Sequence, residues 1–344
     1  MKTLKYRLLT IVALLCGTVA AGQVRDARSA DEEILIQRTC DYFKSNYDYI
    51  NRQGAVVVIA RADRVILCES FDADVNDSFN IGAVTQTFTS TLMAQAAGSK
   101  KLDWSARVSL LVPDFKLKDN FTAERLIVSD LCANNSGLRP CDTLPILLTG
   151  EDLTPPTVRL AETGQLFPYR TAYSENIALN AVAGSIVERA TRSTWAETLQ
   201  DSLLTPLGMA GTSVVAETGA YGPSVGLRST AADMTTWLQL HLNNGRFGES
   251  SLINPSQMSR LHRGLTIEQQ KPDSITLYGY GWHISQSKLG RVFYACGEFD
   301  HQACACCFLP YADLAIMVAG VTGMDRNACL DALWRIIDLA VTPR

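Results

Sequence analysis

A serine followed three residues later by a lysine can support covalent catalysis, because one turn of helix brings the amine beside the hydroxyl whose proton it must take. The 344-residue chain has this spacing at Ser285 and Lys288. These residues lie between two β-rich runs, in a segment that the pattern predicts to be an exposed hairpin turn. A turn in water provides no further group to activate the pair. We therefore interpret this spacing as a chance occurrence.

A second reactive segment is ACACCF, residues 303–308. Thiolates bind metals and attack electrophiles, so His301 with Cys304 and Cys306 suggests a metal site, and the nearby Cys296 suggests a reactive thiol. In a strand, however, alternation places Cys304 and Cys306 on one face and the third cysteine on the other. Buried cysteine behaves as a small hydrophobe. We expect packing cysteines here, with no metal and no cofactor.

The third candidate is the stretch from Phe79 to Gln95, which reads FNIGAVTQTFTSTLMAQ. The residues 80–82 form a turn-like entry, and Phe88 and Leu92 then recur at helical spacing with small or polar residues between them. The pattern predicts a buried helix with a polar first turn. Such a helix start is a good place to present a reactive group.

The elements that must position this helix come from both ends of the chain. We predict helices and strands from the spacing of apolar and β-branched residues. The predicted helices cover residues 31–50, 176–191, 195–204, 230–242 and 324–340, and the predicted strands cover 55–60, 65–69, 278–285, 291–296, 303–309 and 314–321. This order predicts an α/β (α+β) fold with one mostly antiparallel sheet built from both chain ends. Terminal helices flank the sheet, and residues 79–249 form a large helical insert.

Several segments, in this order, resemble the serine β-lactamase and penicillin-binding protein superfamily, over roughly residues 31–340. The segments are KLDWSARVSLLVPDFKLKD, LIVSDLCANNSGL, WAETLQDSLLTPLGMAGTS, VGLRSTAADMTTWLQLHLNNG, LYGYGWHIS and FLPYADLAIMV. The resemblance is closest to class C β-lactamases and their esterase and peptidase relatives. It implies the β-lactamase/transpeptidase-like fold, in one unit covering residues 23–344. Its sheet part would be residues 31–78 and 250–344, and its helical part residues 79–249.

The resemblance also implies where the catalytic groups should be. In the family, the first turn of the helix at residues 79–95 reads Ser-x-x-Lys, with the serine as nucleophile and the lysine beside it. This chain has Ala83 and Gln86 at those two positions. An alanine has no nucleophile and an amide has no useful basicity, so a nearby hydroxyl would find no base.

Two further motifs are also degenerate. The family's Tyr-x-Asn motif, whose tyrosine assists proton transfer, matches Tyr173, with Glu175 in place of the asparagine unless Asn176 takes that position; Tyr169 is the alternative tyrosine. The family's third motif, Lys or His followed by Thr or Gly and then Gly, falls on Ala295, Cys296 and Gly297. The cationic or imidazole side chain of that motif is absent.

The N-terminus has the pattern of a secretory signal. Basic residues precede the apolar run 8–15, and small residues follow, with cleavage expected after Ala21 or Gly22. The run is too short to span a bilayer, and a lipoprotein site at Cys16 is the alternative. The net charge of −4 and the lack of a basic block argue against a nucleic-acid partner. We expect an exported protein, periplasmic or secreted, without a membrane span.

Two functions remain. The sequence favours a pseudoenzyme that keeps the fold and acts by binding a peptide, a cell-wall fragment or another protein, because three groups of one reaction are missing together. The alternative is an active serine-type hydrolase of the β-lactamase, esterase or D-amino-peptidase class with rerouted residues. In that case Thr85, Thr87, Ser90 or Cys296 would have to serve as nucleophile, with Tyr173 as acid and base.

Overall fold

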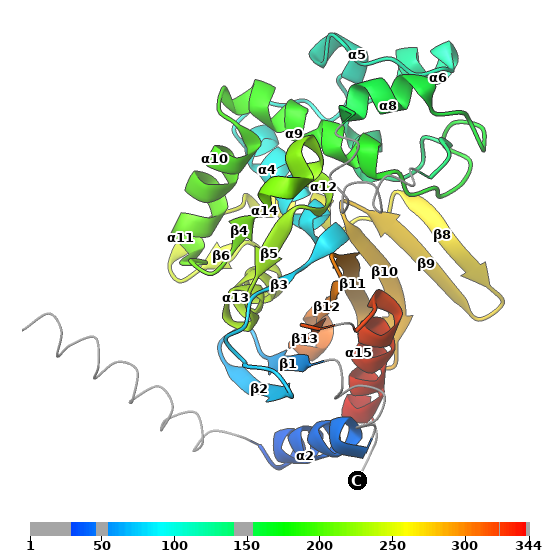
Figure 1. The fold of residues 1–344 in the computed structure, drawn as a ribbon. Helices are drawn as coiled ribbons and strands as arrows, with labels where there is room; N and C mark the ends of the chain where they lie inside the picture. Colours follow the sequence, from blue (N-terminus) through cyan, green and yellow to red (C-terminus); the bar gives the residue numbers. More distant parts are fainter. Residues whose placement is uncertain (1–28, 46–53, 141–153, 323, 342–344) are drawn as a thin grey trace, which may run out of the picture.

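A single large antiparallel sheet organises the molecule (Figure 1). The computed structural model describes residues 29–45, 54–140, 154–322 and 324–341. The eight strands follow the order β2-β1-β13-β12-β11-β10-β9-β8, and every neighbouring pair is antiparallel. They span Ala55–Ala60 (β1), Val65–Phe71 (β2), Thr266–Lys271 (β8), Ser274–Gly279 (β9), Trp282–Ser287 (β10), Gly290–Phe299 (β11), Gln302–Leu309 (β12) and Leu314–Gly320 (β13). The predicted sheet from both chain ends is confirmed.

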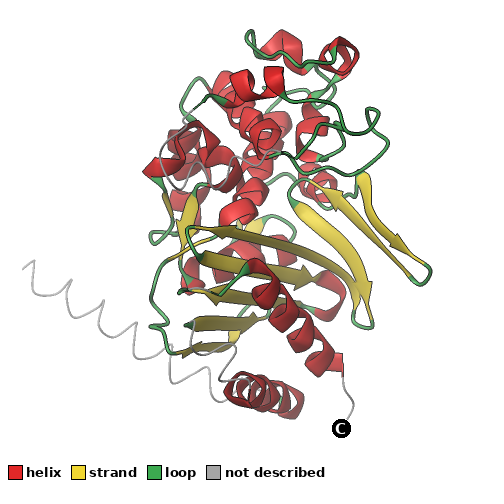
Figure 2. Cartoon of the chain, turned by 45° about the vertical axis from the view of Figure 1, so that its right-hand side comes forward, coloured by secondary structure: helices red, strands yellow, loops and turns green. Residues whose placement is uncertain are grey.

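Helices cover both faces of this sheet. The terminal helices α2 (Ala30–Ser45) and α15 (Arg326–Val341) pack on one face, where α15 crosses the strands (Figure 2). Helix α13 (Ala231–Leu242) packs against β1, β12 and β13 on the other face. Alternate residues of β1 therefore enter two different hydrophobic cores, and all six residues of AVVVIA are buried.

The chain between β2 and β8 is mainly helical, with short strands. Its helices are η3 (Gly82–Val84), α4 (Thr85–Gly98), α5 (Val108–Leu111), α6 (Asn120–Arg125), η4 (Val128–Cys132), α8 (Pro156–Glu162), α9 (Ile177–Thr191), α10 (Trp195–Leu199), η5 (Gln200–Leu204), α11 (Thr205–Leu207), η6 (Ala216–Tyr221), α12 (Gly222–Val225), α13 and α14 (Pro255–Leu261). Its strands are β3 (Phe79–Asn80), β4 (Ser213–Val214), β5 (Leu227–Ser229), β6 (Arg246–Phe247) and β7 (Ser250–Ser251), and η7 (Pro310–Ala312) follows β12. None of the described helices is long and apolar enough to cross a bilayer.

The structure differs from the predicted strands in two places. The strand predicted over residues 278–285 is wrong, because Tyr280 (φ 57°) and Gly281 (φ 86°) turn the chain between β9 and β10. A side chain on Gly281 would come within 2.7 Å of the Thr87 backbone nitrogen, so this turn packs directly against α4. Strand β8 was not predicted, because it is an edge strand whose residues, TIEQQK, are largely polar.

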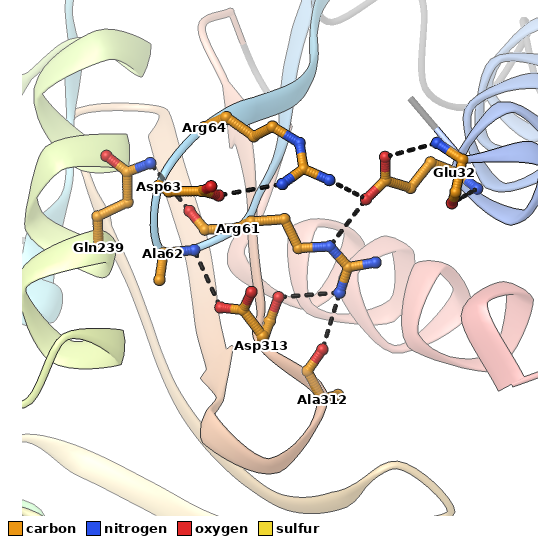
Figure 3. Close-up of polar contacts among 9 residues, drawn as sticks. Glu32, Arg61, Ala62, Asp63, Arg64, Gln239, Ala312 and Asp313 are labelled. Atoms are coloured by element: carbon orange, nitrogen blue, oxygen red, sulfur yellow. Dashed lines mark hydrogen bonds and ion pairs between the residues drawn. The ribbon is translucent and has the colours of Figure 1, made fainter. Parts of the chain in front are cut away.

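A buried carboxylate attaches α2 to the sheet (Figure 3). Glu32, which is 2% exposed, accepts hydrogen bonds from Arg61 at 3.0 Å and from Arg64 at 2.8 Å. Arg61 also donates to the backbone oxygens of Ala312 and Asp313. The turn after β1 is thereby held to α2 and to the turn between β12 and β13. The export signal expected at residues 1–22 lies outside the described residues.

Candidate binding cleft

The start of α4 lies in direct backbone contact with β11. Gly297 on β11 has no side chain, and a Cβ there would overlap the backbone nitrogen of Ala83 and the carbonyl oxygen of Ile81. Gly82, with φ +50°, lies equally close to the backbone of Glu298. Two motif positions that are distant in sequence, Ala83 and Gly297, are thus brought together by glycines that permit the close approach.

Two connected hollows open beside Ala83. An outer cleft of ≈ 900 Å³ and an inner cavity of ≈ 250 Å³ share Ala83, Tyr173, Glu175, Arg326 and Asn327 as lining residues. The inner cavity is also lined by Gln86, Glu268, Tyr278, Gly281, His283, Tyr294, Cys296 and Leu330. Gly297 and Glu298 line the outer cleft.

Most of the motif positions predicted from the sequence meet at these hollows, but Ala295 and the two alternative motif residues, Asn176 and Tyr169, do not. Ala295 is 2% exposed and belongs to the hydrophobic core. Asn176 caps α9, because its Oδ1 accepts from the Leu179 backbone N–H at 2.9 Å. The alternative tyrosine, Tyr169, donates to the Asp130 carboxylate. Tyr173 is therefore the tyrosine of the cleft, and Glu175 is the acid beside it.

A phenol and an amide occupy the place where the family's amine would act. Tyr278 is 3% exposed and donates from its hydroxyl to Gln86 Oε1 at 2.7 Å. Burial raises the pKa of Tyr278 well above its ordinary value, so the phenol stays a neutral donor. Among the described residues, Gln86 Nε2 is buried and finds no hydrogen-bond partner. No base is present in this pair.

Tyr173 and Cys296, the proton-transfer and nucleophile candidates of the cavity, are held in their protonated forms. Burial, followed by the neighbouring Glu175, raises the pKa of Tyr173 far above its ordinary value. Burial also raises the pKa of the Cys296 thiol to about 12, although Arg326 acts in the opposite direction. A thiol in this state is a poor nucleophile at neutral pH.

The hydroxyls on α4 are hydrogen-bonded within the core. Thr85 Oγ1 accepts from the Leu227 backbone N–H at 3.2 Å. Thr87 Oγ1 donates to the Val84 carbonyl at 2.8 Å and accepts from Trp237 Nε1 at 3.2 Å. Both threonines are 0% exposed, Ser90 is 3% exposed, and none of the three lines the cleft or the cavity.

Sequence reasoning missed a row of polar and aromatic side chains across β8 to β11. His283 Nδ1 lies 2.6 Å from Glu268 Oε2, and the imidazole stacks on Tyr294 with ring centroids 4.8 Å apart. The ring of Tyr278 meets His283 edge-on at 4.9 Å. His283 pairs with both Tyr278 and Tyr294 in the sheet register, so alternation could have placed these three on one face, had β9 and β10 been recognised as separate strands.

The cysteines of β12 lie where alternation predicts them. Cys304 and Cys306 enter one core, and Cys307 enters the other. Within the described part of the chain, no three His, Cys, Asp or Glu side chains gather as a metal site would require.

The antiparallel sheet, its terminal helices and a helix start pressed against an inner strand define the β-lactamase/transpeptidase fold. The chain belongs to the beta-lactamase family, whose model matches residues 43–341. Penicillin-binding protein 4 of Amycolatopsis lactamdurans is 27% identical over 236 residues, which are 60% of this chain and 62% of that protein. The match thus spans less than two thirds of this relative.

Solved structures show the same fold at low identity. The octameric penicillin-binding protein homologue from Pyrococcus abyssi matches with a TM-score of 0.73 and 15% identity, over 88% of this chain and 77% of that one. The D-stereospecific amidohydrolase from Streptomyces sp. matches with a TM-score of 0.72 and 15% identity, over 87% and 98%. The class C β-lactamase from Rhodobacter sphaeroides matches with a TM-score of 0.68 and 16% identity, over 88% and 99%.

Proposed function

We propose that this protein is an exported member of the beta-lactamase family that does not catalyse serine acyl transfer and acts by binding a ligand in the cleft beside Ala83. The ligand would be a peptide, a cell-wall fragment or another protein. One observation carries the proposal: the position of the nucleophile holds a methyl group, and the neighbouring amine position holds an amide bonded to a neutral phenol.

The chemistry supports loss of catalysis. Removing the nucleophile of a serine hydrolase costs on the order of 10⁶ in kcat when the rest of the machinery is intact. Here Gln86 also lacks basicity, and the Cys296 thiol, with its pKa raised to about 12 by burial, offers no thiolate at neutral pH. The hydroxyls of Thr85 and Thr87 face the core and not the cleft. Ser174 lines the outer cleft, but its hydroxyl donates to the Leu138 carbonyl at 2.6 Å. None of the nucleophiles that the active-hydrolase alternative names therefore offers an activated group to the cleft.

The geometry supports binding. Ala83, Tyr173 and Glu175 line both hollows, so the cleft persists although its reactive groups are absent. Phe299, which could have filled the space, is 3% exposed and packs in the core. Export is supported by the pattern of basic, apolar and small residues at the N-terminus.

Covalent probes test the loss of catalysis. The purified chain without residues 1–22 would be incubated with a fluorescent penicillin and with a fluorophosphonate, beside an active class C β-lactamase. We expect no covalent label on this chain under conditions that label the control enzyme. Stoichiometric labelling would overturn the proposal, and peptide mapping would identify the nucleophile. The natural chain already lacks both groups, so the matched variant is the double substitution Ala83→Ser/Gln86→Lys, which restores the hydroxyl and the amine.

A further inference from the structure

The inner cavity brings two carboxylates together with three aromatic rings. Glu268 comes from β8, and Glu175 precedes α9. The rings of Tyr173 and Tyr278 meet edge to face with centroids 5.2 Å apart, and Tyr294 forms another part of the wall. Carboxylates attract a cation, and the faces of neutral aromatic rings attract it as well.

The hydrogen bonds leave further acceptors inside the cavity. The Glu268 carboxylate meets His283 Nδ1 through Oε2 at 2.6 Å, and a carboxylate can accept further hydrogen bonds at both of its oxygens. Of the described residues that line the inner cavity and not the outer cleft, Glu268 is the one with a carboxyl group, and none is a lysine or an arginine. Arg326 lines both hollows, so the one guanidinium stands at their shared boundary, where Glu175 also lies.

A separate observation concerns a buried donor. Gln86 is 6% exposed and lines the inner cavity. Its Oε1 accepts from Tyr278, while its Nε2 has no partner among the described residues. An unpaired buried amide is destabilising, and a ligand oxygen that accepts from it would remove this cost on binding. The donor therefore points to a ligand that carries an oxygen acceptor close to its positive charge.

We propose that the inner cavity recognises the ammonium group of a small primary amine with a neighbouring carbonyl oxygen, as in an α-amino amide or the N-terminus of a peptide. This inference rests on the proposed binding function and names the ligand class. Glu175, Glu268 and the tyrosine rings hold the ammonium group, and Gln86 Nε2 donates to the carbonyl oxygen. The volume of ≈ 250 Å³ suits this end of a ligand, and the remainder lies in the outer cleft of ≈ 900 Å³.

Matched small molecules test the charge requirement. Alaninamide carries the ammonium and the carbonyl, N-acetylalaninamide lacks the charge, and lactamide replaces the ammonium by a hydroxyl. Binding to the purified chain would be measured by ligand-observed NMR and titration calorimetry. We expect alaninamide to bind at least about tenfold more tightly than the two neutral analogues. Equal affinities, or no binding of alaninamide, would overturn the inference.

Variants test the location. Glu268→Gln keeps the size of the side chain and an oxygen for His283, and we expect it to weaken alaninamide about tenfold. If circular dichroism shows that Glu268→Gln does not fold, the affinity of Glu175→Gln for alaninamide tests the same site at the mouth of the cavity. Glu249→Gln is the matched control, because Glu249 is exposed between β6 and β7 and lines neither hollow. If both cavity variants bind as the control does, the site lies elsewhere and the inference fails.

The covalent probes separate this inference from the proposed function. Labelling by the fluorescent penicillin overturns the loss of catalysis, whatever the cavity binds. Absence of labelling together with failure of alaninamide overturns the ammonium inference alone.

Discussion

Acid should destabilise this protein through a pair of histidines packed in the core. His241 is 1% exposed and lies among the rings of Trp237, Trp282 and Phe308, at centroid distances of 4.8–5.1 Å. Its Nδ1 lies 3.0 Å from His262 Nε2. Only one proton fits between these two nitrogens. Protonating one ring would place a positive charge in an apolar surrounding, and protonating both rings would also place two like charges side by side.

The expected loss follows from the pKa values. Burial lowers the pKa of His262 from 6.5 to about 4, and burial with the adjacent His262 lowers the pKa of His241 well below its ordinary value. The unfolded chain therefore binds more protons than the folded chain between about pH 6.5 and pH 4, and stability present above pH 6.5 is lost as the pH falls. At about 1.4 kcal/mol per pKa unit, His262 alone corresponds to about 3 kcal/mol. Because its ring is partly exposed, we expect about 2 kcal/mol by pH 4.5.

Urea unfolding followed by tryptophan fluorescence at pH 7, 6, 5 and 4.5 measures this loss. Buried carboxylates contribute to acid sensitivity as well, so the comparison is with the double variant His241→Phe/His262→Phe, which replaces both partners by apolar rings. The free energy of unfolding should fall about 2 kcal/mol more in the natural chain than in the double variant. His301→Asn, in an exposed turn, is the control and should follow the natural chain. Equal pH dependence in the natural chain and the double variant would refute the reasoning.

Three other predictions follow from single positions. Gly297→Ala should lower the free energy of unfolding by more than about 2 kcal/mol in urea titrations, because the new methyl would overlap a backbone nitrogen of η3; an unchanged midpoint would contradict the close contact. Cys296, whose pKa burial raises to about 12, should react with iodoacetamide at pH 8 more slowly than the exposed Cys68, as mass spectrometry of the peptides would show. Asp130→Ala should lower the free energy of unfolding by about 2 kcal/mol, because its buried carboxylate accepts from Arg170 at 2.8 Å, from the Tyr169 hydroxyl and from the Ile127 backbone N–H; thermal unfolding no lower than that of an exposed Asp63→Ala control would argue against it.

Repeating patterns of apolar residues in the sequence predicted the long helices and most strands of the sheet. They did not predict which side chains from distant segments come into contact. Two β-branched runs near the N-terminus and several near the C-terminus were enough to predict a sheet built from both ends, since both faces of β1 are buried. Polar β8 gave no such pattern, and its Glu268 reaches the site only because β8 pairs with β9. The predicted strand ran without a break through Gly281. For that reason the cross-strand pairing of Tyr278 on β9 with His283 on β10 was not predicted.

Under the proposed function, the same residues would link the loss of the reaction to the acidic cavity. The family places an amine at the position of Gln86, and such an amine would lie in the cavity with Glu175 and Glu268 and neutralise their charge. In Gln86, Oε1 instead accepts a hydrogen bond from Tyr278, and Nε2 is an uncharged donor without a partner among the described residues. Cys296 adds no thiolate, since burial raises its pKa to about 12. With no amine at position 86, a cation that arrives with a ligand can approach Glu175 and Glu268, so under the proposed function the change that would end acyl transfer would also favour the ammonium site.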